Sequence, residues 1–202
     1  MRRKPFLSTS RGVEIYEQMI ALRRDFCIDA DFFKMSDVWK YLCDGDGDWA
    51  INTYRSDETE DFKRKAAVVA LGHRVTLTVD EKLMEKATQG CRLSGFILAH
   101  ELSHVALGHH QRAAVTKNFQ LFAGPCGMSN LPPTVEELEA NYAAVFFQCG
   151  VALSDGRWDA VRLANRAFSD IDYVRKAQAI VRLDVFQRLL LCPGPTYPRV
   201  VL

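Results

Sequence analysis

The chain has 202 residues, of which 48% are apolar and 25% are charged, and this mixture is typical of a folded globular protein and excludes wholesale disorder. The length suits one compact domain better than two. The 26 lysines and arginines nearly balance the 25 aspartates and glutamates, which gives a net charge of +1; this balance does not indicate a protein that binds nucleic acid directly, because such domains are usually distinctly basic.

The apolar stretches are too short for a membrane span. The basic residues at positions 2–4 are followed by only a brief apolar run, not by the core of a secretory signal. The six cysteines are scattered and include no Cys-x-x-Cys pair, so we expect reduced thiols that mostly fill the core. These features predict a cytoplasmic protein with no membrane partner.

The first half of the chain combines helical periodicity with one strand-rich region. In chain order it predicts helices over 11–27 and 31–43, a strand over 49–54, hairpin arms over 66–71 and 74–79, and a helix over 81–87. The hairpin linker is Gly72-His73, and a two-residue linker with glycine first favours a type II′ turn. The second arm alternates apolar and polar residues, so one of its faces is expected to be buried.

The second half is mostly helical. It predicts a helix over 92–109, a loop over 113–133, helices over 134–149, 156–167 and 170–191, and an extended tail over 193–202. The first of these helices is apolar on most sides, as buried helices are. It ends in His109 and His110, which we interpret as solvated at the helix end, with transition-state stabilisation by one of them as the alternative.

Residues 100–104, His-Glu-Leu-Ser-His, form an HExxH motif within this buried helix. Histidines four residues apart share one face of a helix, so both rings can bind one metal ion. Glu101 lies about 100° from His100 around the helix, beside the metal, where it would take a proton from a metal-bound water. A buried helix rarely carries three ionisable groups in one turn unless a ligand compensates them. The motif therefore predicts a zinc centre.

A catalytic zinc ion needs a third protein ligand and an open position. Glu137 and Asn141 are four residues apart on a later helix and share a face with two alanines, which allow close approach to the histidine helix. We expect Glu137 to be the third ligand and Asn141 to orient a ligand histidine. Residues 134–137, Thr-Val-Glu-Glu, also fit a capping box, in which Glu137 would fold back on the Thr134 amide instead.

Two segments resemble a known family. Residues 95–109, Gly-Phe-Ile-Leu-Ala-His-Glu-Leu-Ser-His-Val-Ala-Leu-Gly-His, resemble the active helix of the ImmA/IrrE metallo-endopeptidases. The pattern from Glu137 to Ala144, with alanine and asparagine at 140 and 141, resembles their third-ligand helix. The hairpin and the helices before it follow the family's order, so the resemblance covers about residues 11–150. Residues 145–150 depart from the family's usual ending, and the loop from 105 to 136 is long.

The resemblance implies a zinc-dependent, thermolysin-like core whose relatives cleave or inactivate DNA-binding repressors. It assigns zinc ligation to His100, His104 and Glu137, and the role of general base to Glu101. We expect an α+β fold, with a mostly helical body and a small antiparallel sheet. Residues 1–150 would form the peptidase core, and 151–202 a C-terminal helical extension and tail of the same domain.

The leading functional hypothesis is a cytosolic zinc endopeptidase that cleaves a specific protein, a helix-turn-helix repressor, without contacting nucleic acid itself. An unrestrained peptidase in the cytosol would damage its host, which favours a specific substrate. The alternative is a non-catalytic metal-containing protein that sequesters a regulator. Glu101 favours the enzyme, because a binding protein needs no base beside an open coordination position.

Overall fold

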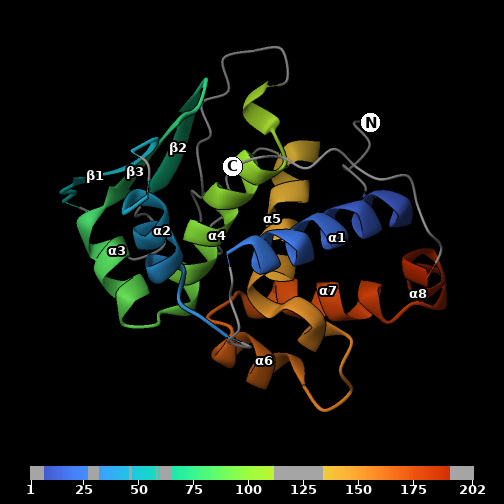
Figure 1. Ribbon diagram of the computed structural model, residues 1–202. Coiled ribbons are helices and arrows are strands. Elements are labelled where there is room, and N and C mark those ends of the chain that lie inside the picture. The colour runs from blue at the N-terminus through green and yellow to red at the C-terminus, as the bar shows by residue number, and fades with distance from the viewer. Residues whose placement is uncertain are drawn as a thin grey trace, which may run out of the picture.

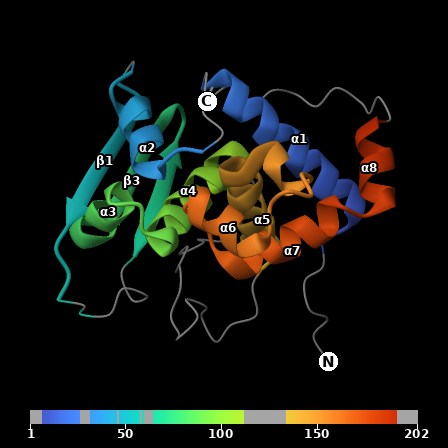
Figure 2. The same cartoon turned by 90° about the horizontal axis from the view of Figure 1, so that it is seen from below.

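The computed structural model describes residues 7–26, 32–45, 47–57, 59, 65–111 and 134–191. Its strands are β1 (Trp49–Tyr54), β2 (Ala66–Leu71) and β3 (Arg74–Asp80). Its helices are α1 (Thr9–Asp25), α2 (Met35–Cys43), α3 (Glu81–Thr88), α4 (Arg92–Ala106), α5 (Val135–Cys149), α6 (Ala160–Arg166), α7 (Ile171–Val181) and α8 (Asp184–Leu191), with short 3-10 helices η2 (His109–Gln111) and η3 (Gly150–Leu153). The sheet with α2 and α3 lies on one side, the other helices lie on the opposite side, and α4 runs between them (Figures 1 and 2). The α+β class is confirmed.

The sheet is mixed, so the expectation of an antiparallel sheet is wrong in part. β2 and β3 form the predicted antiparallel hairpin, but β1 pairs with the other edge of β3 and runs parallel to it, with Trp49 opposite Val75 and Tyr54 opposite Asp80. Alternating apolar and polar residues indicate which face of a strand is buried, not which partner it takes or in which direction. The connection over 55–73 exceeds the dozen or so residues that a parallel pairing requires.

A single residue at each end determines where β3 begins and where it stops. Gly72 in the hairpin turn has a φ of +63°, in the left-handed region that favours glycine. Asp80 at the other end is the N-cap of α3, and its carboxylate accepts the backbone N–H groups of Lys82 and Leu83 at 2.9 and 3.2 Å. Between these ends the apolar residues of β3 face the core and are buried: Val75, Leu77 and Val79.

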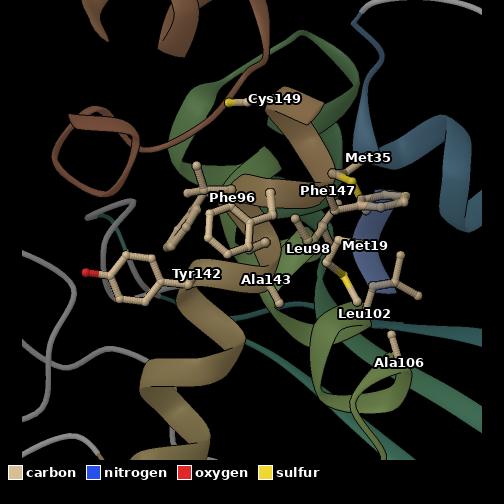
Figure 3. Packing of buried hydrophobic residues seen from close by; sticks show 14 of the residues in the cluster. Met19, Met35, Phe96, Leu98, Leu102, Ala106, Tyr142, Ala143, Phe147 and Cys149 are labelled. Carbon is tan, nitrogen blue, oxygen red and sulfur yellow. The ribbon is translucent and has the colours of Figure 1, made fainter. Parts of the chain in front are cut away.

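Helix α4 is buried along nearly its whole length, from Ser94 to Ala106. It contacts α5, β2, α3 and α2, and its apolar side chains belong to the buried core (Figure 3). Gly95 allows a close approach, because a Cβ there would stand 2.6 Å from the backbone oxygen of Phe168. On another side, the indole N–H of Trp39 donates to the backbone oxygen of Leu98 at 3.1 Å. The helix that carries the HExxH motif is thus held from several sides.

Helix α5 lies against both α4 and α1. Thr134 is its N-cap, and the hydroxyl oxygen accepts the backbone N–H of Glu137 at 3.2 Å. Three alanines of α5 are fully buried, namely Ala140, Ala143 and Ala144. Their small side chains let α5 approach α4, and this approach brings the start of α5 to the histidine pair.

The predicted helix over 170–191 is divided in two. Helix α7 ends at Val181, whose backbone oxygen accepts a hydrogen bond from the side-chain Nε2 of Gln187 at 2.6 Å, and α8 then runs beside α1. Phe186 of α8 is fully buried, with its ring centroid 5.8 Å from that of Tyr16 on α1. The burial of this aromatic side chain on α1 accounts for the change of direction, which helical periodicity alone does not reveal.

Several expectations concern residues that lie outside the described ranges. The predicted loop over 113–133 and the tail over 193–202 are among them. Within the described ranges, Cys43, Cys91 and Cys149 are free thiols, and no helix combines the length and the hydropathy needed to cross a bilayer.

Candidate metal centre

The histidines of the HExxH motif stand one turn apart on α4 and direct their rings to the same point. Their Nε2 atoms are 2.9 Å apart, and neither residue is more than 2% exposed. Two unprotonated ring nitrogens at this separation repel each other unless a proton or a cation lies between them. The pair is therefore placed to share a proton or, together with a further donor, to bind a cation.

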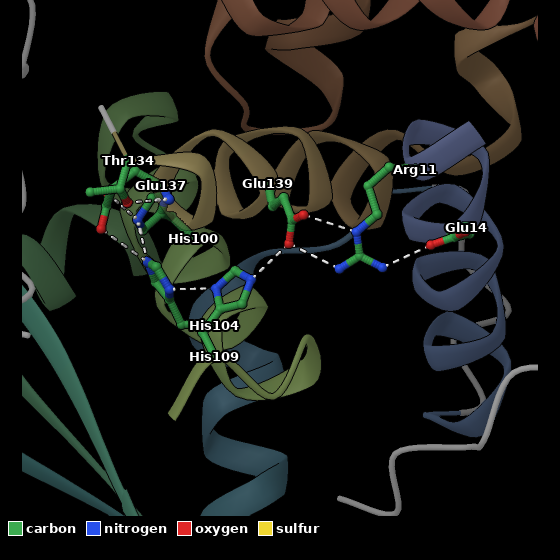
Figure 4. Close-up of polar contacts among 8 residues, drawn as sticks. All are labelled: Arg11, Glu14, His100, His104, His109, Thr134, Glu137 and Glu139. Atoms are coloured by element: carbon green, nitrogen blue, oxygen red, sulfur yellow. Dashed lines mark hydrogen bonds and ion pairs between the residues drawn. The ribbon is translucent and has the colours of Figure 1, made fainter. Parts of the chain in front are cut away.

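Glu137, from the first turn of α5, supplies the third donor group. Its carboxylate oxygens lie 3.2 Å from Nε2 of His100 and 3.5 Å from Nε2 of His104. The side chain points to the histidines, while the Glu137 backbone N–H bonds to the Thr134 hydroxyl (Figure 4). The helix cap is thus made by Thr134, and the carboxylate is left for the histidine pair.

The separations among these donors fit a metal ion. One ligand atom from each of His100, His104 and Glu137 lies within 4.8 Å of the other two. Donor atoms bound to a tetrahedral zinc ion stand about 3.3 Å from one another. The two Nε2 atoms are 2.9 Å apart, and the Glu137 carboxylate reaches each of them with a different oxygen, at 3.2 and 3.5 Å. Two imidazoles and one carboxylate are also a donor set that zinc takes in catalytic sites. The group can therefore hold a metal ion.

Asn141 lies one turn beyond Glu137 on α5 and contacts His100. Its Oδ1 atom is 2.9 Å from Nδ1 of His100. Because an amide oxygen only accepts hydrogen bonds, the proton of the neutral imidazole is on Nδ1, and Nε2 keeps its lone pair. The structure thus places Asn141 behind His100, where it holds the ring in the form that can bind a metal.

Glu101 is fully buried between α4 and the hairpin. Its Oε2 atom accepts the backbone N–H of Val68 at 2.9 Å, whereas Oε1 has no hydrogen-bond partner among the described residues. Burial raises the pKa of Glu101 well above its ordinary value; the Val68 hydrogen bond opposes this rise, and the Glu137 carboxylate adds to it. A cation next to both carboxylates would favour their ionised forms.

His109 is buried, 1% exposed, so the interpretation of this residue as solvated at the helix end is wrong. Gly108, with a φ of +65°, turns the chain after α4 and η2 follows it. This turn brings Nδ1 of His109 to 2.9 Å from Nδ1 of His104. The signal for this residue in the sequence is a third histidine close to the motif. No local pattern predicts the turn that directs it inward.

Glu139 and Arg11 continue the contacts beyond His109 (Figure 4). Oε2 of Glu139 lies 3.1 Å from Nε2 of His109, and the carboxylate accepts two hydrogen bonds from the Arg11 guanidinium, each of 2.9 Å. Burial opposes ionisation of Glu139, but hydrogen bonds from Arg11 and His109 outweigh it and lower its pKa to about 2. Sequence reasoning assigned no function to either residue.

Aromatic side chains of α4 and α7 lie near the His100 ring. The ring centroid of Phe96 is 6.4 Å from that of His100, and Phe96 stacks on Tyr173 of α7 at 5.4 Å. Burial raises the pKa of Tyr173 to about 12, with smaller contributions in the same direction from Tyr142 and nearby carboxylates. Its hydroxyl group therefore stays protonated in neutral solution.

Comparisons of the chain with protein-family models, with curated proteins and with solved structures gave no match.

Proposed function

We propose that this protein is a cytosolic zinc-dependent endopeptidase with a thermolysin-like core. The observation that carries the proposal is the Glu101 carboxylate, next in sequence to His100 and close enough to Glu137 for that carboxylate to raise its pKa, fully buried and with one oxygen unpaired among the described residues. A site that only stores or sequesters a metal needs the three donors and no buried carboxylate next to them, because burying such a group without compensation is costly. A general base in a peptidase needs that arrangement.

The residues divide the chemistry among them. A zinc ion held by His100, His104 and Glu137 would supply Lewis acidity, which lowers the pKa of water and polarises a peptide carbonyl. Glu101 would take the proton of the attacking water through its unpaired oxygen and pass it to the leaving amine. The Val68 N–H holds the second oxygen of Glu101 in place. Peptide hydrolysis by water needs no further co-reactant.

The edge of the sheet offers a place for an extended substrate. In the strand order β1-β3-β2, β2 lies at one edge and β3 in the centre, so β2 is the arm available for pairing. Its Val68 N–H reaches Glu101, so the outer side of β2 borders the metal centre. Val69 and Leu71 of β2 are 63% and 83% exposed. A peptide added to this edge as a further strand would pass in front of the base.

The substrate that we propose is a specific protein, a helix-turn-helix repressor encoded near this chain. The resemblance of residues 95–109 and 137–144 to the ImmA/IrrE peptidases supports this class of substrate. The net charge of +1 supports a protein that reaches DNA only through a protein partner, because it provides no strong electrostatic attraction to phosphates.

Elemental analysis of the purified protein tests the metal centre. We expect one zinc ion per chain in the wild type and loss of the metal in the His104→Ala variant, with His110→Ala as the matched control. His110 lies close to the motif but is not a member of the donor group. Equal metal content in the wild type and His104→Ala would overturn the proposed ligand set.

Incubation of the zinc-loaded protein with the neighbouring repressor and, separately, with casein tests the activity. We expect cleavage of the repressor, little cleavage of casein, and loss of both after chelation of the metal. Tight repressor binding without cleavage would identify the alternative, a metal-containing protein that sequesters a regulator. Fast cleavage of casein with the repressor intact and unbound would indicate a general peptidase instead.

A further inference from the structure

Behind one ligand of the candidate metal centre, three residues from three different elements form a continuous hydrogen-bonded chain. His109 of η2 contacts His104, Glu139 of α5 contacts His109, and Arg11 of α1 contacts Glu139. His109 is 1% exposed and Glu139 is 4% exposed. Because water is largely excluded from these two residues, their hydrogen bonds are screened less than surface contacts are. The proposed general base, Glu101, is not part of this chain.

For neutral imidazole rings, the Glu139 carboxylate determines which atoms donate and which accept along these hydrogen bonds. Both oxygens of Glu139 accept from Arg11, and a carboxylate has only acceptors, so Nε2 of His109 donates to it. The neutral ring of His109 then has a lone pair on Nδ1, which accepts from Nδ1 of His104 across 2.9 Å. His104 is left with its lone pair on Nε2, the atom that lies beside Glu137.

The two ligand histidines are thus held in the same tautomer by different means. His100 donates to the neutral amide of Asn141, whereas His104 donates to a chain that ends in a carboxylate. A carboxylate behind a ligand histidine fixes its ring orientation and makes it a stronger donor to the metal. Arg11 in turn holds the Glu139 carboxylate through two hydrogen bonds, a geometry that specifies direction as well as charge.

We propose that His109, Glu139 and Arg11 are positioning residues of the metal centre, which fix the orientation and tautomer of His104 and so set the zinc affinity of the site. Helix α1, which contributes no metal ligand, would then support metal binding through Arg11. This inference depends on the metal-binding part of the proposed function and not on peptidase activity.

Zinc affinity of the full chain, measured by competition with a chromophoric chelator, tests the inference. We expect His109→Leu and Glu139→Gln to bind zinc about 10–100-fold more weakly than the wild type, the range typical of residues that support metal ligands. We expect His109→Gln to recover most of the affinity, because an amide can both donate to Glu139 and accept from His104. Glu14→Gln is the matched control: Glu14 also bonds to Arg11, at 3.0 Å, but is not one of the residues that link Arg11 to His104.

Two further measurements separate positioning from a structural role. Thermal unfolding of each metal-free variant identifies any loss of fold, and the cobalt-substituted spectrum reports the ligand field, which a purely structural role would leave unchanged. If His109→Leu does not fold, Glu139→Gln and His109→Gln carry the test. If Glu139→Gln and His109→Leu fold and bind zinc within twofold of the wild-type affinity, this inference is overturned and the proposed metal centre is not. Absence of zinc binding by the wild type would overturn it together with the proposed metal centre.

Discussion

The carboxylate of Glu101 accepts the backbone N–H of Val68 at 2.9 Å, so the helix with the HExxH motif is bonded directly to the edge strand of the sheet. The bond occupies one carboxylate oxygen and leaves the other without a partner among the described residues. It therefore fixes the orientation of the proposed base relative to the strand on which a substrate would lie. In the proposed peptidase, this one contact would couple the position of the base to the position of the substrate.

Replacement of the base tests the mechanism directly. The Glu101→Gln variant should keep its zinc, because Glu101 is not in the donor group, and its amide oxygen can still accept from Val68. Removal of the proton acceptor should lower the rate of substrate cleavage by about 10²–10⁴. Zinc content and the cleavage rate are measured on the same preparation. A zinc-replete variant with wild-type activity would eliminate Glu101 as the base.

Replacement of the third ligand separates metal binding from helix capping. The Glu137→Gln variant should lose more zinc affinity than the roughly 10–100-fold typical of supporting residues, because an amide is a poor zinc ligand. The helix should remain, since the Thr134 hydroxyl caps it through the backbone N–H of residue 137. Chelator competition and circular dichroism are the measurements. Glu136→Gln is the matched control, one residue away and outside the donor group; equal zinc affinity in both variants would contradict the assignment.

Close packing of α4 is tested by adding a single methyl group. The Gly95→Ala variant would place a Cβ 2.6 Å from the backbone oxygen of Phe168, and overpacking of this kind typically costs about 1–3 kcal/mol. The free energy of unfolding, from urea titration, should fall by this amount. Gly156→Ala is the control, because no heavy atom lies within 4 Å of its Cβ position, and a change within about 0.5 kcal/mol is expected. Equal stability of the two variants would show that α4 can move.

The buried cysteine of α5 should be unreactive in the native protein. Burial raises the pKa of the Cys149 thiol far above its ordinary value, and the nearby Arg23 opposes the rise only in part. Since the thiolate is the reactive form, iodoacetamide at pH 8 should modify Cys149 only after unfolding, whereas the partly exposed Cys91 should react in the native state. Mass spectrometry of alkylated peptides is the measurement. Equal native rates at the two sites would show that the core opens readily.

The local parts of the candidate metal centre were predictable from the sequence. His100 and His104 meet because residues four apart share a helix face, and the same spacing places Glu137 and Asn141 on one side of α5. Alanines beside that face indicated that the two helices approach each other. The hairpin around Gly72 was predictable for a similar reason, since two residues define its turn.

The remaining features depend on contacts that no local pattern encodes. The parallel pairing of β1 with β3 depends on the path of a long connection, and strand alternation says nothing about it. The burial of His109 depends on the turn at Gly108 and on the Glu139 carboxylate, which α5 places beside the ring. In the sequence, Arg11 is indistinguishable from an ordinary surface arginine. Only the folded structure places its distant partner, Glu139, beside it.

Arg11 and Glu139 are separated by 128 positions in the chain, and this separation has a consequence for the order of folding. Contacts between distant residues close large loops and tend to form late. The HExxH turn can form within its own helix, whereas the third ligand and the support for His104 require α1 and α5 to dock first. A chain emerging from the ribosome would thus carry the histidine motif well before Glu137 and Glu139 reach it, so the proposed zinc binding and the proposed activity would begin only when the helical body is closed.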